Sequence, residues 1–118
     1  MSWIDRTQPT PYGYAEVDPR EVAAHPAPAR LIDVREPAEF TGPLGHVAGS
    51  ELVPLATLPV AAADWDRDAT YLLICRSGGR SAHAAATLAR MGFPRCTNLT
   101  GGMLAWNDAG LPIVGGPT

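Results

Sequence analysis

The sequence predicts an α/β fold, a three-layer sandwich in which a mostly parallel sheet carries helices on both faces. Short apolar runs with strand character alternate with segments of helical composition along nearly the whole chain. The clearest example is Tyr71–Ile74, an apolar run followed by two glycines and then by a segment rich in Ala, Leu and Arg. That order is typical of a buried strand, a tight loop and a helix, and parallel strands joined by helices place those helices on both sides of the sheet.

Capping and proline signals mark the first elements. Tyr14–Val17 has the composition of a short strand, and the residues after it, 18–21, read Asp-Pro-Arg-Glu, which suits the N-cap, N1 and N3 positions of a helix. Pro26 prevents that helix from continuing. The next apolar run, Arg30–Val34, predicts a strand, and Pro37 suits the first turn of a short helix.

The second half repeats the alternation. Turn residues separate its apolar runs, and Gly92 followed by Phe93 and Pro94 ends the longest helix. We expect strands at residues 51–55, 71–74 and 96–99, and helices at 57–65, 81–91 and 103–108.

The length of 118 residues suits one compact domain. Residues 1–13 contain two prolines and several polar residues, and we expect them to form an irregular lead-in. The domain is expected to span residues 14–114, and residues 115–118 to form a tail.

Composition excludes several classes of chemistry. All nine basic residues are arginine, so a lysine nucleophile or Schiff base is excluded. The net charge of −3 argues against nucleic acid as a partner, and no apolar run is long enough to cross a membrane. Two cysteines and three scattered histidines show neither a disulfide framework nor the spacing of a metal site. We therefore expect a cytoplasmic protein that uses no metal and no organic cofactor.

Cys75 is the candidate nucleophile. It lies where the predicted strand ends, and the loop after it leads to the N-terminus of a helix, whose first N–H groups have no partner within the helix. Gly78 and Gly79 allow the backbone to turn further N–H groups inward, and Arg76 and Arg80 add positive charge. A free thiol has a pKa of about 8.5, and such surroundings lower it. This prediction requires that the loop amides converge on an accessible sulfur.

A cysteine at the end of an apolar run is more often a small core residue than a nucleophile. The sequence that follows Cys75, Arg-Ser-Gly-Gly-Arg, favours the nucleophile instead. Core packing gives no reason to place two glycines and two arginines directly after a buried strand.

Four motifs together resemble the rhodanese family. They are Asp-Val-Arg-Glu-Pro-Ala-Glu-Phe at residues 33–40, Gly-His-Val-Ala-Gly-Ser at 45–50, Cys-Arg-Ser-Gly-Gly-Arg-Ser at 75–81, and Gly-Gly-Met-Leu-Ala-Trp at 101–106. They occur in that family's order and spacing, and the resemblance extends from about Tyr14 to Ile113.

The resemblance implies the rhodanese fold and sulfurtransferase chemistry, in which Cys75 would carry a transient persulfide. A donor such as thiosulfate would supply the sulfur, and cyanide, a small thiol or a sulfur-accepting protein would remove it. It also implies that Asp33 and Arg35 border and support the site. The anion-binding loop would comprise Arg76, Ser77, Gly78, Gly79, Arg80 and Ser81.

The length of the loop separates related reactions. Cysteine phosphatases of similar fold place five residues between cysteine and arginine, whereas four lie between Cys75 and Arg80. We expect the smaller ring of amides to hold one sulfur atom rather than a phosphoryl group. Two alternatives to a sulfurtransferase remain open here: a persulfide carrier or interaction module with little free turnover, and a phosphatase or arsenate reductase.

The other polar and sulfur-containing residues have simpler interpretations. Arg35 is spaced to pair with Glu39 across a helical turn. Arg80 either holds the substrate together with Arg76 or ties the loop to Asp33 or Glu39. His46 is expected to brace a loop, and Cys96 to fill the core. Trp106 is expected to anchor the core beside the glycine turn.

Overall fold

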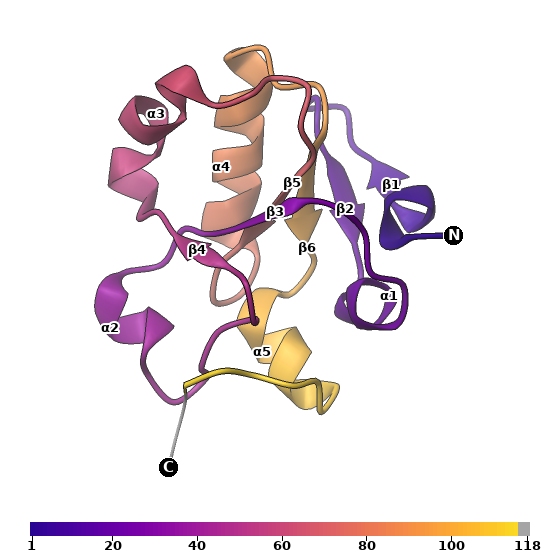
Figure 1. The fold of residues 1–118 in the computed structure, drawn as a ribbon, viewed down its shortest axis with the longest axis vertical. Helices are drawn as coiled ribbons and strands as arrows, with labels where there is room; N and C mark the ends of the chain where they lie inside the picture. Colours follow the sequence, from indigo (N-terminus) through magenta and orange to yellow (C-terminus); the bar gives the residue numbers. More distant parts are fainter. Residues whose placement is uncertain (116–118) are drawn as a thin grey trace.

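The computed structural model of the protein describes residues 1–115. One six-stranded sheet organises these residues, in the strand order β1-β2-β6-β5-β3-β4 (Figure 1). Only the pair β1–β2 is antiparallel, and every other neighbouring pair is parallel. The strands are β1 (Gln8–Pro9), β2 (Ala15–Val17), β3 (Arg30–Asp33), β4 (Glu51–Leu52), β5 (Tyr71–Ile74) and β6 (Cys96–Leu99). The predicted α/β fold is confirmed.

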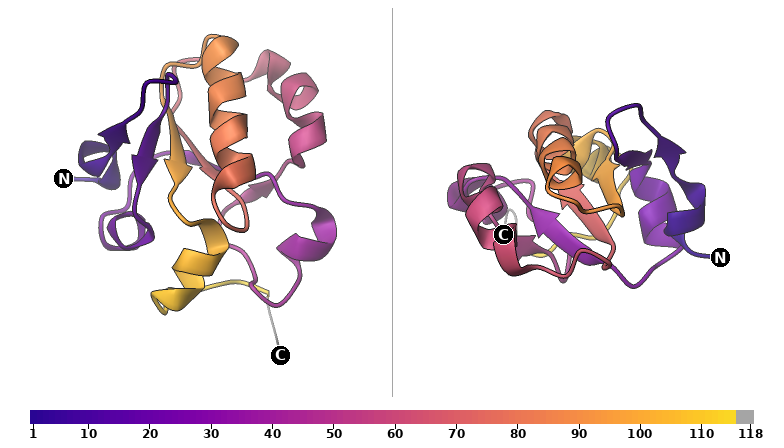
Figure 2. Two further views of the ribbon diagram at one scale, coloured as in Figure 1. Left: turned by 180° about the vertical axis from the view of Figure 1, so that it is seen from behind. Right: turned by 90° about the horizontal axis from the view of Figure 1, so that it is seen from above.

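The helices divide between the two faces of the sheet. Residues of α3 and α4 pack on one face with Phe93, and residues of α1 and α5 pack on the other with Trp3 (Figures 1 and 2). The helices are α1 (Pro19–Ala24), α2 (Pro37–Phe40), α3 (Leu58–Ala61), α4 (Gly79–Arg90) and α5 (Gly102–Asp108).

Strand β5 carries both halves of the core. Its residues are completely buried, and alternate side chains join different clusters: Tyr71 and Leu73 pack under α4, whereas Leu72 and Ile74 pack under α5. This alternation follows from the two-residue period of a strand. Cys75 is two residues after Leu73 and therefore lies on the side of the sheet that α4 covers. Its sulfur is directed toward the start of that helix.

The N-terminal segment differs from the irregular lead-in that we expected. It contains the 3₁₀ helix η1 (Trp3–Arg6) and strand β1, which pairs with β2. The Trp3 backbone N–H donates to the His25 carbonyl at 2.7 Å, and its side chain is buried in the α1–α5 cluster. Burial of a side chain as large as that of Trp3 stabilises an ordered segment, and this gain exceeds the tendency of the proline-rich sequence toward irregular structure.

Two other predicted elements are shorter than expected. Strand β4 has two residues because Pro54 lacks an N–H. The Val53 amide still donates to the Asp33 carbonyl, and the Leu55 amide to the Val34 carbonyl. The helix expected at residues 57–65 is divided into η2 (Leu55–Thr57), α3 and η3 (Ala62–Asp64). Of the expected tail 115–118, residues 116–118 lie outside the described residues.

Candidate active site

The start of α5 holds the beginning of the loop after β5. The Cys75 and Arg76 carbonyls accept hydrogen bonds of 2.9 Å from the Met103 and Leu104 amides at the start of α5. Gly102 permits this approach: its φ is +58°, and a Cβ there would overlap the Cys75 carbonyl and lie 2.7 Å from the Arg76 carbonyl. The glycine pair before α5 thus belongs to the architecture of the cysteine loop.

Gly78 shapes the loop around the sulfur. Its φ of +102° turns its N–H toward Cys75, and that N–H donates to Sγ at 3.0 Å. A Cβ at Gly78 would lie 3.1 Å from the Gly101 nitrogen. At Gly79, by contrast, an added Cβ would have no neighbouring atom of residues 1–115 within 4 Å, and φ is not positive. Of the two glycines singled out in the sequence, only Gly78 is required by the local geometry.

The electrostatic surroundings favour the anionic form of the Cys75 thiol. Burial opposes this, since it raises the pKa. Hydrogen bonds from the Ser81 hydroxyl and from the N–H groups of Ser81, Gly78 and Ser77 outweigh burial, so the pKa of Cys75 lies below its ordinary value. The nearest of these donors to Sγ are the Gly78 N–H at 3.0 Å and the Ser81 hydroxyl oxygen at 3.2 Å.

The accessibility of Cys75 differs from the expectation. The residue is only 1% exposed, whereas we expected an accessible nucleophile. The turn at Gly78 brings its N–H to 3.0 Å from Sγ, so the backbone of the loop lies close to the sulfur. A reagent must therefore be small or displace part of the loop, whose residues Arg76, Ser77 and Gly79 are exposed.

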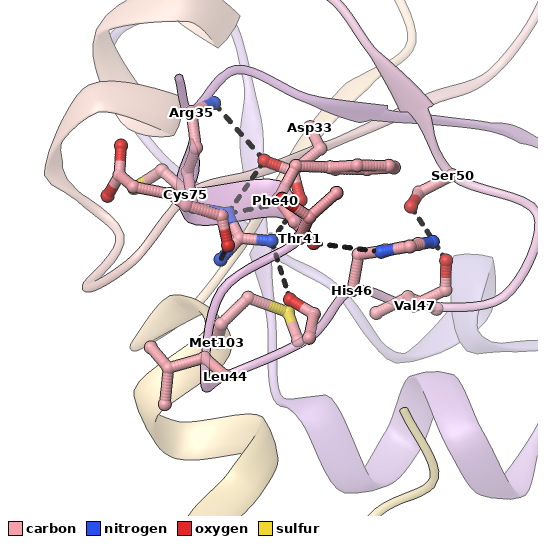
Figure 3. Close-up of polar contacts among 12 residues, drawn as sticks. Asp33, Arg35, Phe40, Thr41, Leu44, His46, Val47, Ser50, Cys75 and Met103 are labelled. Carbon is pink, nitrogen blue, oxygen red and sulfur yellow. Dashed lines mark hydrogen bonds and ion pairs between the residues drawn. The ribbon is translucent and has the colours of Figure 1, made fainter. Parts of the chain in front are cut away.

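Asp33 and Arg35 form a buried ion pair beside this loop (Figure 3). The two side chains are 0% and 1% exposed, and their shortest N–O distance is 2.7 Å. Arg35 also donates to the carbonyls of Gly45 at 2.8 Å and Glu39 at 3.2 Å. The prediction that the Glu39 side chain pairs with Arg35 is wrong, because the guanidinium is taken by Asp33 and by main-chain oxygens.

The Glu39 carboxylate binds Arg80 instead. Two contacts of 2.7 and 2.8 Å join them, so the interpretation that Arg80 ties the loop to Glu39 matches the structure. Arg76 behaves differently: it is exposed, and within residues 1–115 its side chain makes no ion pair or hydrogen bond. A cavity of about 320 Å³ lies beside Arg76, lined also by Arg35, Glu39, Pro43 and Leu44.

The three remaining candidates have structural roles. The His46 ring nitrogen Nδ1 lies 2.9 Å from the Phe40 carbonyl and its ring stacks on that of Phe40, which braces the loop between α2 and β4 (Figure 3). Cys96 is buried, and burial raises the pKa of its thiol to about 12. Trp106 is buried and donates to the Pro112 carbonyl at 2.8 Å.

Sequence reasoning missed two residues near the sulfur, Asn98 and Glu16. Ser81 Oγ lies 3.2 Å from Cys75 Sγ and 2.5 Å from Asn98 Oδ1, and Asn98 Nδ2 in turn donates to the Glu16 carboxylate at 3.1 Å. A polar side chain in a central strand of a sheet is a signal that was available for Asn98. Glu16 gave no such signal, because strand pairing alone brings it to Asn98.

Residues 1–115 lack two further kinds of feature. None of their helices combines the length and the apolar character that a membrane crossing needs. Their His, Cys, Asp and Glu side chains form no group of three or more able to hold a metal ion.

Comparison with known proteins identifies the family. The model of the Rhodanese-like domain family matches residues 18–109. A sulfurtransferase of Allochromatium vinosum is 38% identical over 84 residues, which are 71% of this chain and 77% of that protein. The thiosulfate sulfurtransferase GlpE of Pseudomonas aeruginosa is 32% identical over 80 residues, 68% of this chain and 71% of GlpE.

A solved structure agrees with these matches. The rhodanese-related protein of Thermoplasma volcanium has a TM-score of 0.76 and 29% identity, and the alignment covers 84% of this chain and 96% of that one. The fold, the cysteine loop and the sequence relatives lead to one conclusion: the chain belongs to the family of rhodanese-like sulfurtransferases.

Proposed function

We propose that the protein moves a sulfane sulfur from thiosulfate to a thiophilic acceptor through a persulfide on Cys75. One observation carries the proposal: the Cys75 sulfur accepts a hydrogen bond from Gly78 N–H at 3.0 Å in the loop before Arg80, and the Ser81 hydroxyl oxygen lies 3.2 Å from the same sulfur. Donors converging on a sulfur stabilise its negative form. The similarity to a sulfurtransferase and to GlpE supports the same chemistry.

In the first step the Cys75 thiolate attacks the outer sulfur of thiosulfate. A bond forms between Sγ and that sulfur, the bond between the two thiosulfate sulfurs breaks, and sulfite leaves with the electron pair. The outer sulfur remains as a persulfide, and we expect the loop amides of Ser77, Gly78 and Ser81, which lower the pKa of the Cys75 thiol, to stabilise its negative charge.

Arg76 is the residue that we assign to the anionic end of the donor. Arg80 and Arg35 already contact carboxylates, whereas Arg76 has no such partner among the described residues and borders the cavity beside the loop. A guanidinium suits a sulfonate because it offers several donors in a plane.

In the second step an acceptor takes the outer sulfur and restores the thiolate. Cyanide, a small thiol or a cysteine of a sulfur-accepting protein attacks that sulfur, and the Sγ–S bond breaks with its electrons returning to Cys75. The two half-reactions need no metal and no organic cofactor. A reducing compartment such as the cytoplasm suits this cycle, because it keeps Cys75 from forming a disulfide.

A second candidate is a persulfide carrier that delivers sulfur to one protein and turns over poorly with free acceptors. The 1% exposure of Cys75 favours it, since a sulfur under the loop is protected from small thiols until a partner opens access. A phosphatase or arsenate reductase is disfavoured by the short loop between Cys75 and Arg80.

Mass spectrometry after thiosulfate treatment tests the proposal. We expect the mass of the protein to increase by one sulfur atom, and the increase to be absent in Cys75→Ser and retained in the matched control Cys96→Ser. Cyanide should then remove the sulfur, and steady-state kinetics should give the parallel double-reciprocal lines of a ping-pong reaction. An unchanged mass would overturn the proposal. Stable loading with discharge only to a protein thiol would support the carrier.

A further inference from the structure

A chain of polar side chains leads from the active-site sulfur across the sheet. It runs from Cys75 through Ser81 at the start of α4 to Asn98 in β6 and Glu16 in β2. Asn98 and Glu16 are partners in the parallel register of these strands, so their side chains share one face of the sheet, the face that α4 covers.

The orientation of the Asn98 amide follows from its neighbours. Its Nδ2 lies 3.1 Å from each carboxylate oxygen of Glu16 and 3.1 Å from the Gly78 carbonyl, and all three atoms only accept hydrogen bonds. A flipped amide would place its oxygen against these acceptors. Oδ1 therefore faces the Ser81 hydroxyl.

Ser81 has one hydroxyl proton and two acceptors. Oγ lies 2.5 Å from Asn98 Oδ1 and 3.2 Å from Cys75 Sγ, and the proton serves only one of them at a time. The shorter contact places it on Asn98 while the thiol is neutral, which leaves an Oγ lone pair facing an S–H group. A thiolate reverses the preference, because a hydrogen bond to a charged acceptor is the stronger one.

We propose that the Ser81 hydroxyl is a two-position donor, which rests on Asn98 and turns to Cys75 when that sulfur becomes negative, and that Asn98 is a positioning residue held by Glu16 and Gly78. The turn moves the proton without breaking the O–H bond. It leaves the Asn98 carbonyl, which is buried, without its donor, so Asn98 competes with the thiolate for Ser81. The proposal rests on the proposed function only in taking Cys75 as the nucleophile.

Other charged groups also act on the sulfur, and none of the substitutions in the test replaces one of them. Two pairs among them are internally neutralised, Asp33 with Arg35 and Glu39 with Arg80. The charged groups on the elements packed around the loop are Arg76, Arg80, Asp33, Arg35, Glu39 and Glu16.

The test is the pH dependence of Cys75 alkylation by iodoacetamide, with the modified cysteine identified by mass spectrometry. Ser81→Ala should raise the apparent pKa, because the thiolate loses a donor. Asn98→Ala should lower it by about half a pH unit or more, the equivalent of one weak hydrogen bond, because Ser81 then serves the sulfur alone. The double variant Ser81→Ala/Asn98→Ala should match Ser81→Ala, since Asn98 acts through Ser81.

Thr100→Ala is the matched control. Its hydroxyl donates to Glu16 at 2.8 Å, whereas among residues 1–115 the Ser81 hydroxyl bonds only to Asn98 and Cys75, so the removal of the Thr100 hydroxyl should leave the pH profile unchanged. Asn98→Leu, similar in size and without an acceptor, should lower the apparent pKa in the same way and serves where Asn98→Ala fails to fold.

Two results would overturn the proposal: an apparent pKa that stays or rises in the Asn98 variants, or an equal shift with and without Ser81. The second result would mean that Asn98 acts by supporting the loop through Gly78. Because no sulfur donor is used, a protein that fails to take sulfur from thiosulfate would contradict the proposed function and leave the proton placement intact.

Discussion

Arg80 and Glu39 face each other across two contacts of 2.7 and 2.8 Å, although 41 positions separate them in the chain. Arg80 lies in the first turn of α4 and Glu39 in α2, so the pair joins the cysteine loop to the helix beside it. The hydrogen bond from Arg80, helped by the Glu36 amide, lowers the pKa of Glu39 to about 2. The pair therefore holds the loop in place over a wide pH range.

Replacing Glu39 by Gln should weaken sulfur transfer at neutral pH. We expect the turnover with thiosulfate and cyanide to fall about ten-fold or more, because a loop displaced by a fraction of an ångström no longer aligns its amides. Glu51→Gln is the matched control: it breaks the comparable Arg30–Glu51 pair, which lies away from the loop. Equal losses in the two variants would contradict a local role.

The same pair predicts a pH dependence of stability. The pKa of Glu39 is about 2 in the folded protein against 4.5 ordinarily, so its contribution is complete above 4.5 and is lost as the pH falls from 4.5 toward 2. The free energy of unfolding, measured by urea titration, should fall more steeply over this window in the native protein than in Glu39→Gln. Parallel curves would exclude the coupling.

Breaking the Asp33–Arg35 pair should destabilise the protein strongly. Removing one partner by Arg35→Leu leaves a carboxylate buried without its counter-charge, at a cost of about 3–5 kcal/mol. Removing both, as in Asp33→Leu/Arg35→Leu, should cost less than the sum of the two single changes. Urea unfolding measures all three, and strict additivity would show that the two charges act independently.

Gly78 and Gly79 offer a matched comparison within one loop. Gly78→Ala should lose most activity, because alanine at φ +102° is strained by roughly 1–3 kcal/mol and its Cβ would press on the Gly101 nitrogen. Gly79→Ala should be tolerated, since no atom lies near the added methyl group. Thiosulfate turnover and thermal melts of the two variants test this, and similar losses would refute the assignment of the turn to Gly78.

Reagent size should decide the reactivity of Cys75. Its lowered pKa increases the fraction of thiolate, whereas its 1% exposure restricts access. Iodoacetamide should therefore react measurably faster than a bulky maleimide, the reverse of the order for a model thiol such as glutathione. Cys96, with a pKa of about 12, should stay unmodified in the folded protein. A size-independent rate at Cys75 would show that the loop opens freely.

Trp3 should contribute to stability although it precedes the expected domain. Its side chain is buried, so Trp3→Ala should cost about 3–5 kcal/mol. Ile4→Ala, a change at an exposed neighbour, is the control and should cost little. Chemical denaturation compares the two variants. A native-like free energy of unfolding for Trp3→Ala would mean that the N-terminal segment adds little to the stability of the domain.

Most of the fold followed from local patterns. The apolar run of β5, the glycines after it and the helix-forming residues of α4 are signals within short stretches of sequence, so these elements are readable from the chain. Predictions failed where a distant partner competed with a near one. Glu39 lies four positions from Arg35, yet its carboxylate binds Arg80, 41 positions away, because α2 and the start of α4 meet in the fold.

By itself the sequence determined the α/β order of elements, the family motifs and Cys75 as the candidate nucleophile, because each depends on residues that are close in the chain. The tertiary structure alone decided the partners of the charged residues, the burial of Cys75 and the path from Ser81 to Glu16. These depend on which strands become neighbours in the sheet: β2 and β6 are far apart in the sequence, and only their pairing brings Glu16 to Asn98.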